Sequence, residues 1–284
     1  LEKGRLVMCV DPDWMPLEAL SDNRYVGIAA DIYADMISPL LPVPIEVYPS
    51  QTWVESLDAV QARTCDLLSL AVPTASRRRY LNFTQPYIRA PLVLATAMDK
   101  PFVENLQQIE ERRIGVVRGY AFGELLRERQ PNLKVVDVES IMDGLKRVEN
   151  GELYGYVDNL ISISANIQQG FPGQLKISAR LDDHLPLAVG VRNDDPVLFS
   201  IFERAIQHIN AANKDKQRIL SDWISVRQDV AIDYDLIWQA LLVLALVGAA
   251  FAFHYSHLWR YNRRLRQISE TDALTGLYNR LRAD

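Results

Sequence analysis

Apolar residues in the first 226 positions alternate between short continuous runs and stretches with the spacing of a helix face. The runs RLVMCV (5–10), PIEVY (44–48) and CDLLSLA (65–71) predict strands. Between them, residues 27–41 and 52–63 predict helices. One face of the first helix would carry Ile28, Ile32, Met36 and Leu40.

A second set of the same kind follows. Strands are predicted at 114–119, 133–138, 153–158 and 187–192, and helices at 121–130, 140–151, 161–170 and 196–211. Repeated β–α alternation predicts an α/β fold with parallel sheets, and two sets of about 100 residues predict two lobes with a binding cleft between them. Lobe 1 would comprise about 1–93 and 190–230, and lobe 2 about 94–189.

The only long uncharged stretch lies near the C-terminus. Residues 236–259 contain no Asp, Glu, Lys or Arg. About 20 apolar residues in a helix cross the ~30 Å hydrocarbon layer of a membrane. The sequence therefore predicts a transmembrane helix at 235–258 rather than the buried core helix of a soluble protein. Aromatic residues mark both ends, as at membrane interfaces: Tyr234, Trp238, Tyr255, Trp259 and Tyr261.

Charges on either side of this stretch predict its orientation. Four arginines follow it within residues 260–266, whereas Asp229, Asp233 and Asp235 precede it or lie at its start. Positive residues favour the cytoplasmic side. We therefore expect a single-pass protein of the bacterial inner membrane, with residues 1–234 in the periplasm, the C-terminus in the cytoplasm and a linker helix at 259–270.

Composition excludes several classes of protein. The 284 residues carry a net charge of −5, with 49% hydrophobic and 24% charged residues, which is typical of a globular protein without a basic surface for nucleic acid. Neither a metal-binding motif nor a catalytic set of residues stands out. Cys9 and Cys65 leave two interpretations open: a disulfide if their strands are neighbours, or two buried free thiols, which is the favoured one.

Five segments narrow the fold further. They are DPDWMPLE (11–18), VGIAADI (26–32), TASRRRYLNFTQPY (74–87), IGVVRGYAFGELL (114–126) and YGYVDN (154–159). In this order they resemble the type 2 periplasmic solute-binding proteins, in the amino-acid-binding branch, over nearly all of residues 1–226. The resemblance implies a two-lobed Venus flytrap fold that binds a small solute between its lobes.

Two charged residues are the first candidates for ligand binding. The guanidinium of Arg77 can bind a carboxylate through two hydrogen bonds, and the resemblance implies that it holds the α-carboxylate of an amino acid. Asp158 ends a predicted strand, where the resemblance implies a bond to the ligand ammonium. The alternatives are a solvated charge for Arg77 and a helix N-cap for Asp158. Arg78 and Arg79 are expected at the surface.

Three further candidates are Trp14, Gly119 and Tyr120. The resemblance implies that Trp14 packs on the ligand side chain, with plain core packing as the alternative. Gly119 and Tyr120 precede a helix whose free N–H groups suit an anion, or they form only a tight turn. The chain departs from many amino-acid binders, because Leu70–Val72 and Tyr120–Ala121 stand where those proteins have hydroxyl residues.

The last residues indicate an output domain. Leu258, Tyr261, Leu265 and Ile268 have the 3, 4, 3 spacing of a short pairing seam or of an ordinary amphipathic helix. DALTGLYNR (272–280) resembles the D-x-L-T-G-L-x-N-R opening of GGDEF domains, so that 271–284 would begin such a domain. The resemblance implies a homodimeric parent protein that makes cyclic di-GMP from two GTP with Mg²⁺. The present residues lack the signature loop, so no catalytic site and no cofactor are expected within them.

The sequence thus predicts the sensor portion of a diguanylate cyclase-type receptor with a small amino-acid or carboxylate ligand. Three alternatives stay open: a ligand-free interaction module in a receptor, a solute-binding protein for transport, and the sensor of a histidine kinase.

Overall fold

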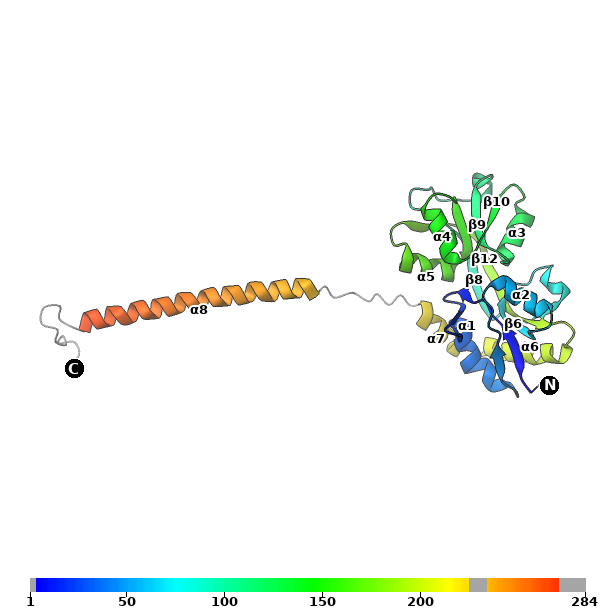
Figure 1. The fold of residues 1–284 in the computed structure, drawn as a ribbon, viewed down its shortest axis with the longest axis horizontal. Coiled ribbons are helices and arrows are strands. Elements are labelled where there is room, and N and C mark those ends of the chain that lie inside the picture. The colour runs from blue at the N-terminus through cyan, green and yellow to red at the C-terminus, as the bar shows by residue number, and fades with distance from the viewer. Residues whose placement is uncertain (1–3, 225–233, 271–284) are drawn as a thin grey trace. The chain divides into compact units, whose positions relative to one another are not determined.

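The computed structural model describes residues 4–224 and 234–270. They fall into two units, an outer α/β domain within Leu1–Ser225 and a long helix within Val226–Asp284. The outer domain has two lobes, which Figure 1 shows with β9, β10 and α3–α5 in one and β6, α1, α2, α6 and α7 in the other. This is the predicted two-lobed α/β fold.

Lobe 1 is built on three parallel strands in the order β6-β1-β5. Its strands are β1 (Leu6–Cys9), β5 (Ile45–Val47), β6 (Leu67–Ala71) and β7 (Leu81–Phe83), with a hairpin sheet of β2 (Asp13–Trp14), β3 (Glu18–Ser21) and β4 (Arg24–Val26). Its helices are α1 (Ile28–Ile32), α2 (Trp53–Gln61), the short 3₁₀ helix η3 (Arg77–Arg79), α6 (Pro196–Ala211) and α7 (Asn213–Ile224). All five residues of β6 are buried, as its apolar run predicts.

The helix predicted at 27–41 is interrupted. After α1 the chain forms a π-helical turn, η1 (Tyr33–Ile37), and then a 3₁₀ turn, η2 (Ser38–Leu40). This change of winding turns Ile37 inward and leaves Leu40 46% exposed. The prediction that Leu40 shares a buried face with Ile28 and Ile32 is therefore wrong.

Lobe 2 repeats the strand–helix alternation. Its parallel strands are β9 (Arg113–Val117), β10 (Lys134–Val138) and β11 (Gly155–Asn159), and its helices are η4 (Leu106–Ile109), α3 (Ala121–Arg129), α4 (Ile141–Glu149) and α5 (Leu160–Gly170). Helix α4 has a capped start, because the Ser140 hydroxyl accepts a hydrogen bond from the Asp143 N–H at 3.0 Å.

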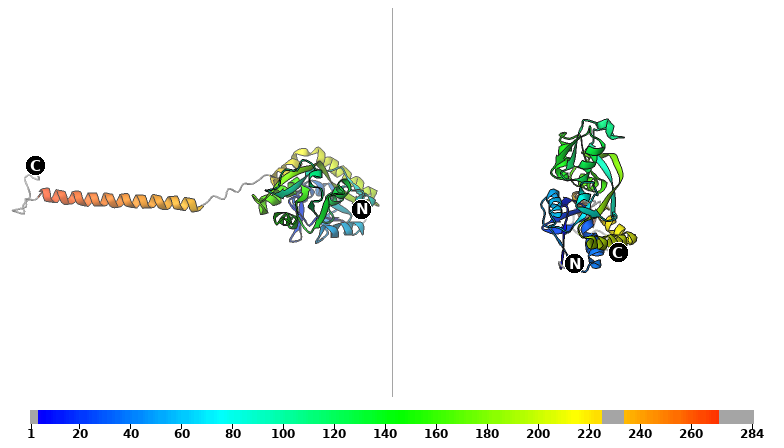
Figure 2. Two further views of the ribbon diagram at one scale, coloured as in Figure 1. Left: turned by 90° about the horizontal axis from the view of Figure 1, so that it is seen from above. Right: turned by 90° about the vertical axis from the view of Figure 1, so that its right-hand side faces the viewer.

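Two long strands join the lobes. They are β8 (Ile88–Ala97) and β12 (Leu175–Arg192), which pair antiparallel with each other along most of their length (Figure 1 and Figure 2). The strand order is β10-β9-β11-β8-β12-β6-β1-β5. The sheets are therefore mixed, with the predicted parallel strands flanking an antiparallel pair that the sequence did not predict. The lobe boundaries expected near 93 and 190 fall within these two strands.

The two cysteines form a disulfide. Cys9 at the end of β1 and Cys65 just before β6 are bonded, with their Cα atoms 5.7 Å apart. Both are fully buried. The favoured interpretation of two free thiols was wrong, because β1 and β6 are neighbours in the parallel sheet and bring the cysteines to bonding distance.

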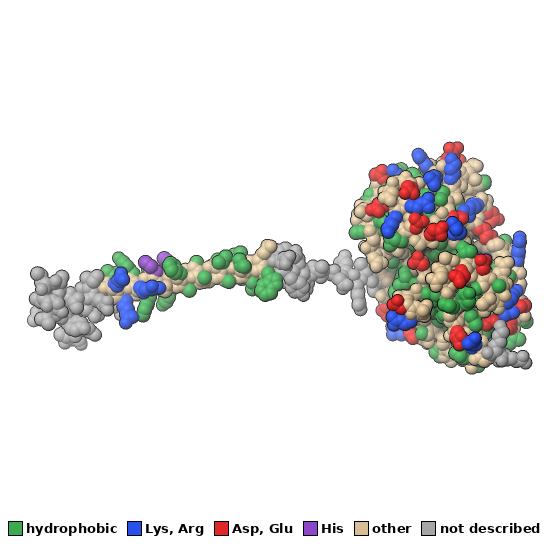
Figure 3. All heavy atoms as spheres, viewed as in Figure 1, with side chains coloured by type: hydrophobic (Ala, Val, Ile, Leu, Met, Phe, Trp, Pro, Cys, Tyr) green, Lys and Arg blue, Asp and Glu red, His purple; other side chains and the backbone are tan. Residues whose placement is uncertain are grey.

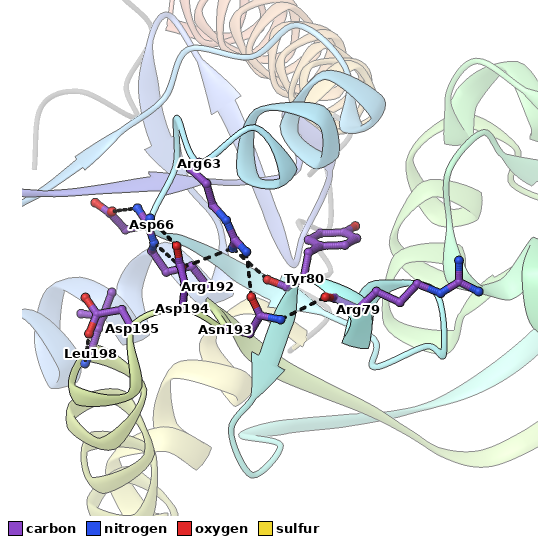
Figure 4. Close-up of polar contacts among 9 residues, drawn as sticks. All are labelled: Arg63, Asp66, Arg79, Tyr80, Arg192, Asn193, Asp194, Asp195 and Leu198. Atoms are coloured by element: carbon purple, nitrogen blue, oxygen red, sulfur yellow. Dashed lines mark hydrogen bonds and ion pairs between the residues drawn. The ribbon is translucent and has the colours of Figure 1, made fainter.

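A polar network fixes the end of β12 to the edge of lobe 1 (Figure 4). Arg192 bonds the Asp66 carboxylate at 3.2 Å and the Asp194 carboxylate at 2.8 Å. The Arg63 guanidinium donates to the carbonyl of Tyr80 at 2.9 Å and to the side chain of Asn193 at 2.7 Å. Because these residues come from three separate segments, the network fixes the connection between β12 and α6.

Helix α7 packs on α1. The Trp223 indole N–H donates to the Asp31 carboxylate at 2.6 Å, and Ile219 is buried beneath the helix. The last helix of the outer domain is therefore attached to the helix that follows the β2–β4 hairpin.

The second unit is helix α8 (Tyr234–Glu270). Its segment Leu241–Leu265, with a mean hydropathy of 1.7, is long and apolar enough to cross a membrane, and none of the most apolar part is buried within protein. Hydrophobic side chains cover most of its drawn length, and Lys/Arg side chains gather towards its C-terminal end (Figure 3). These properties fit the predicted membrane span rather than a buried core helix. The tail 271–284, with the GGDEF-like motif, lies outside the described residues.

Candidate functional site

The five residues predicted for ligand binding converge where the two lobes meet. Trp14 belongs to the hairpin of lobe 1 and Arg77 to η3. Gly119 and Tyr120 lie between β9 and α3 of lobe 2, and Asp158 lies near the end of β11. Strand ends and the loops after them therefore form the junction, as expected for open α/β sheets.

Arg77 is buried and bonded to protein carbonyls. Its side chain donates to the carbonyl of Val72 at 3.0 Å and to that of Gly119 at 2.9 Å, so that it spans the two lobes. The guanidinium also lies 5.4 Å from the centre of the Trp53 ring. Burial lowers the pKa of Arg77. Arg78 is exposed, in keeping with its expected surface position.

Asp158 is fully buried and accepts hydrogen bonds from both lobes. The Trp14 indole N–H donates to it at 3.1 Å, and the Tyr156 hydroxyl at 3.0 Å. The backbone and side-chain N–H groups of Asn159 donate at 2.6 and 2.7 Å. Burial raises the pKa of Asp158 to about 6.

Asp158 does not cap the following helix. That position belongs to Asn159, whose side-chain oxygen accepts the Ser162 N–H at 2.9 Å. The carboxylate of Asp158 is therefore directed at the junction between the lobes, and the helix-cap interpretation does not apply to it.

Aromatic rings close the junction around these two charges. The Tyr120 ring lies 5.4 Å from that of Trp14 and 5.5 Å from that of Phe122. Gly119 has φ +82°, a left-handed conformation that favours glycine, and this turn presents its carbonyl to Arg77 and to the Trp53 indole at 3.1 Å. The predicted glycine turn exists, and its carbonyl rather than its N–H group makes the contact.

The remaining space holds no more than a water molecule. Its volume is about 10 Å³, and ligand pockets for small molecules measure roughly 300–1,000 Å³. Leu70, Ala71 and Val72 line it where many amino-acid binders have hydroxyl groups, together with Tyr120 and Ala121. In this structure the lobes are closed on their own side chains.

Sequence analysis missed two buried acids beside this site. Asp11 is 3% exposed and lines the cavity; its Oδ1 accepts the Asp13 N–H at 2.9 Å, and its Oδ2 has no hydrogen bond among the described residues. Glu18 is fully buried, accepts the Asp11 N–H at 3.0 Å and the Tyr25 hydroxyl at 2.8 Å, and bonds the Ser69 hydroxyl.

Burial raises the pKa of Asp11 to about 7 and that of Glu18 to about 8. The sequence did carry a signal for these two acids, because DPDWMPLE holds three acidic residues directly after a buried strand. The described residues contain no group of three His, Cys, Asp or Glu side chains suited to a metal ion.

Comparisons with known proteins agree with this architecture. The chain is 24% identical over 250 residues to the virulence sensor protein BvgS of Bordetella pertussis, which covers 87% of this chain and 20% of that protein. It therefore spans about a fifth of the length of this curated relative. The fold resembles the crystal structure of the periplasmic VFT2 domain of the same sensor, with a TM-score of 0.70 at 23% identity over 78% of this chain and 94% of that one.

Two other solved structures have the same fold. A histidine kinase sensor domain with similarity to periplasmic binding proteins gives a TM-score of 0.69 at 20% identity, covering 78% of this chain and 96% of that one. An ancestral arginine-binding protein bound to arginine gives 0.68 at 18% identity, covering 78% and 98%. The family model for bacterial extracellular solute-binding proteins, family 3, matches residues 6–226. This match covers the whole two-lobed domain, and the chain belongs to that family.

Proposed function

We propose that the chain is the extracytoplasmic sensing domain and membrane helix of a single-pass receptor, and that its outer lobes respond to a small carboxylate such as an amino acid. The observation that carries this proposal is that Arg77 and Asp158 are both buried at the junction between the lobes, where each bonds across it, Arg77 to the Gly119 carbonyl and Asp158 to the Trp14 indole. The membrane-length helix, the match to a sensor protein and the fold shared with an arginine-binding protein support it.

The internal contacts suggest how a ligand would act. A ligand carboxylate would replace the Gly119 carbonyl at Arg77, and an ammonium would replace the Trp14 indole at Asp158. Because the closed junction has room for about one water, the lobes would first have to separate. Ligand binding would therefore exchange one set of bonds between the lobes for another and change their spacing.

Binding of an amino acid should depend on the charge of Asp158. A thermal-shift screen of the full chain in detergent tests wild type and Asp158→Asn, each with amino acids and with matched organic acids that lack the ammonium group. Loss of a charge-assisted bond of about 1.5–3 kcal/mol weakens binding roughly 10- to 150-fold. Asp158→Asn should lose affinity for the amino acid and keep it for the ligand without an ammonium group.

Arg78→Ala is the matched control for Arg77→Ala, because its side chain is exposed beside the buried Arg77. Arg78→Ala should bind like wild type and Arg77→Ala should bind no carboxylate. A ligand bound equally by wild type and by a folded Arg77→Ala protein would contradict the site.

The filled junction favours a second candidate, a sensing module that works without a small ligand. In that case the bonds from Arg77 to Gly119 and from Trp14 to Asp158 serve only to hold the lobes closed. No thermal shift with any compound, together with a loss of stability in Asp158→Asn, would favour this candidate.

Towards the membrane, we propose that α7 and α8 connect the lobes to a cytoplasmic output. Asp31 and Trp223 join α7 to α1, so a shift of the hairpin that carries Trp14 would reach α7 through α1. The arginines after the span support a cytoplasmic C-terminus under the positive-inside rule.

The full-length parent should convert GTP to cyclic di-GMP as a homodimer. This proposal rests on the resemblance of 272–280 to the opening of GGDEF domains, and the histidine kinase sensor domain of the same fold makes a kinase the alternative. Purified parent protein is assayed for cyclic di-GMP from GTP and for autophosphorylation from ATP. Leu265→Glu, on the pairing seam, should reduce turnover, whereas Asn262→Glu, outside it, should not. Autophosphorylation without cyclic di-GMP would replace this output by a kinase.

A further inference from the structure

A second groove, separate from the junction between the lobes, lies where β8 begins beside the α6–α7 connection. Its volume is about 420 Å³. Two cations line it, Arg89 from β8 and Lys216 from α7. The other polar lining groups are the amide side chains of Gln85, Asn210, Asn213 and Gln217. Pro86, Tyr87, Ile88 and Leu220 complete the lining, so the polar part of the groove offers amide groups and positive charge, and no acid lines it.

Neither cation has an acidic partner among the residues that the structure describes. Lys216 is partly buried, and its ammonium donates to the Asn210 side-chain oxygen at 2.8 Å. Asn210 in turn donates to the Pro86 carbonyl at 3.2 Å, which fixes the amide that orients Lys216. Burial and the charge of Arg89 both lower the pKa of Lys216. Arg89 is exposed and forms no hydrogen bond or ion pair with any described residue.

Glu203, an acid at the edge of this region, is already bonded. Glu203 of α6 accepts the Gln85 N–H at 2.9 Å and the Gln207 amide at 3.1 Å. It therefore holds the edge of the groove and leaves the two cations unneutralised. Helix α7 begins at Asn213, so its N-terminal N–H groups add to the positive potential of the same groove.

From this arrangement we infer that the groove binds a phosphate group, either as free phosphate or as the phosphodiester headgroup of an anionic lipid. Two cations match the charge of free phosphate and exceed the single charge of a phosphodiester, and the phosphate oxygens can accept hydrogen bonds from Lys216, Arg89 and the amides. Only residues 225–233 separate α7 from α8 in the sequence, so a membrane surface is one source of phosphate. Bound there, the anion would connect β8, which runs through both lobes, to the last helix before the membrane span.

The test uses the full chain in nanodiscs. In phosphatidylcholine discs, inorganic phosphate is titrated against chloride at equal ionic strength, and unfolding of the outer domain is followed by tryptophan fluorescence. In the second arm, discs that contain phosphatidylglycerol replace the free phosphate. The variants are Lys216→Gln, Arg89→Gln and the conservative Lys216→Arg. Arg218→Gln is the matched control, because Arg218 is exposed on the same helix and does not line the groove.

Phosphate should raise the melting temperature of wild type, Lys216→Arg and Arg218→Gln, and each glutamine variant in the groove should weaken binding at least tenfold. A response only to phosphatidylglycerol, with the same dependence on Lys216, would identify the lipid headgroup as the source. Equal responses of Lys216→Gln and Arg218→Gln, or no response in either arm, would overturn the inference. Unchanged melting temperatures of the variants without anion would show that they fold. This outcome does not depend on Arg77 and Asp158, so the two sites are tested separately.

Discussion

Lowering the pH from 8 to 5 should stabilise the outer domain. Burial is the main cause that raises the pKa of three acids here: Glu18 from 4.5 to about 8, Asp11 from 3.8 to about 7 and Asp158 from 3.8 to about 6. Between the ordinary and the raised pKa the folded protein holds protons that the unfolded chain has lost, so its stability falls as the pH rises. Over this range Asp158 contributes about 1 kcal/mol and Asp11 between about 2 and 3 kcal/mol.

Urea unfolding at pH 5, 6, 7 and 8 measures this dependence. Asp158→Asn and Asp11→Asn should each reduce the slope, because an amide does not titrate, whereas Asn in place of the exposed Asp35 should leave it unchanged. Stability that stayed constant or rose from pH 5 to 8 would show that these carboxylates are solvated, which would contradict closed lobes. Asp194 does not interfere, since its pKa is lowered to about 2.

Removal of the disulfide should have the largest effect on stability. The bond between Cys9 and Cys65 closes a loop with a sequence separation of 56. On the loop-entropy estimate, its loss in Cys9→Ala/Cys65→Ala lowers the free energy of unfolding by roughly 4 kcal/mol. Both sulfur atoms are buried in the core of lobe 1, so small cavities add to the loss.

The matched measurement compares wild type and the double variant by chemical unfolding with and without a reducing agent. Reductant present during unfolding should lower the stability of wild type towards that of the variant and should leave the variant unchanged. Equal stability of both proteins without reductant would mean that the cysteines are not bonded in solution.

Elements with a regular pattern were predictable from the sequence, and the strands that join the lobes were not. Helices α2 to α6 and strands β6 and β9–β11 each bury one side or both, and their spacing shows it. Strand β8 contains Pro91 and β12 contains Pro186, and proline within a run argues against a central strand. The structure accommodates Pro91 where the register between β8 and β12 shifts. Such irregular pairing depends on two segments far apart in the chain, which local periodicity does not record.

The residues of the candidate site were predictable from the sequence, but the closed arrangement of the lobes around them was not. Arg77, Asp158 and Trp14 could be chosen because each follows a strand and fits a family pattern. Their contacts across the junction depend on how the two lobes meet, which no local pattern encodes. Asp11 escaped notice because its importance lies in burial against Tyr120 and Phe122 of the other lobe, and its own segment reads as a polar turn.

The two crossing strands also set the order in which the domain can assemble. Lobe 2 lies in one continuous stretch of chain, whereas β6 of lobe 1 pairs with the last part of β12. A chain that is synthesised from its N-terminus therefore exposes β1, β5 and β6 long before the last part of β12 and helix α6 have been made. Lobe 2 can complete its own sheet first, while lobe 1 has an open apolar strand edge. This interval is when the emerging chain most needs a chaperone that covers strand edges.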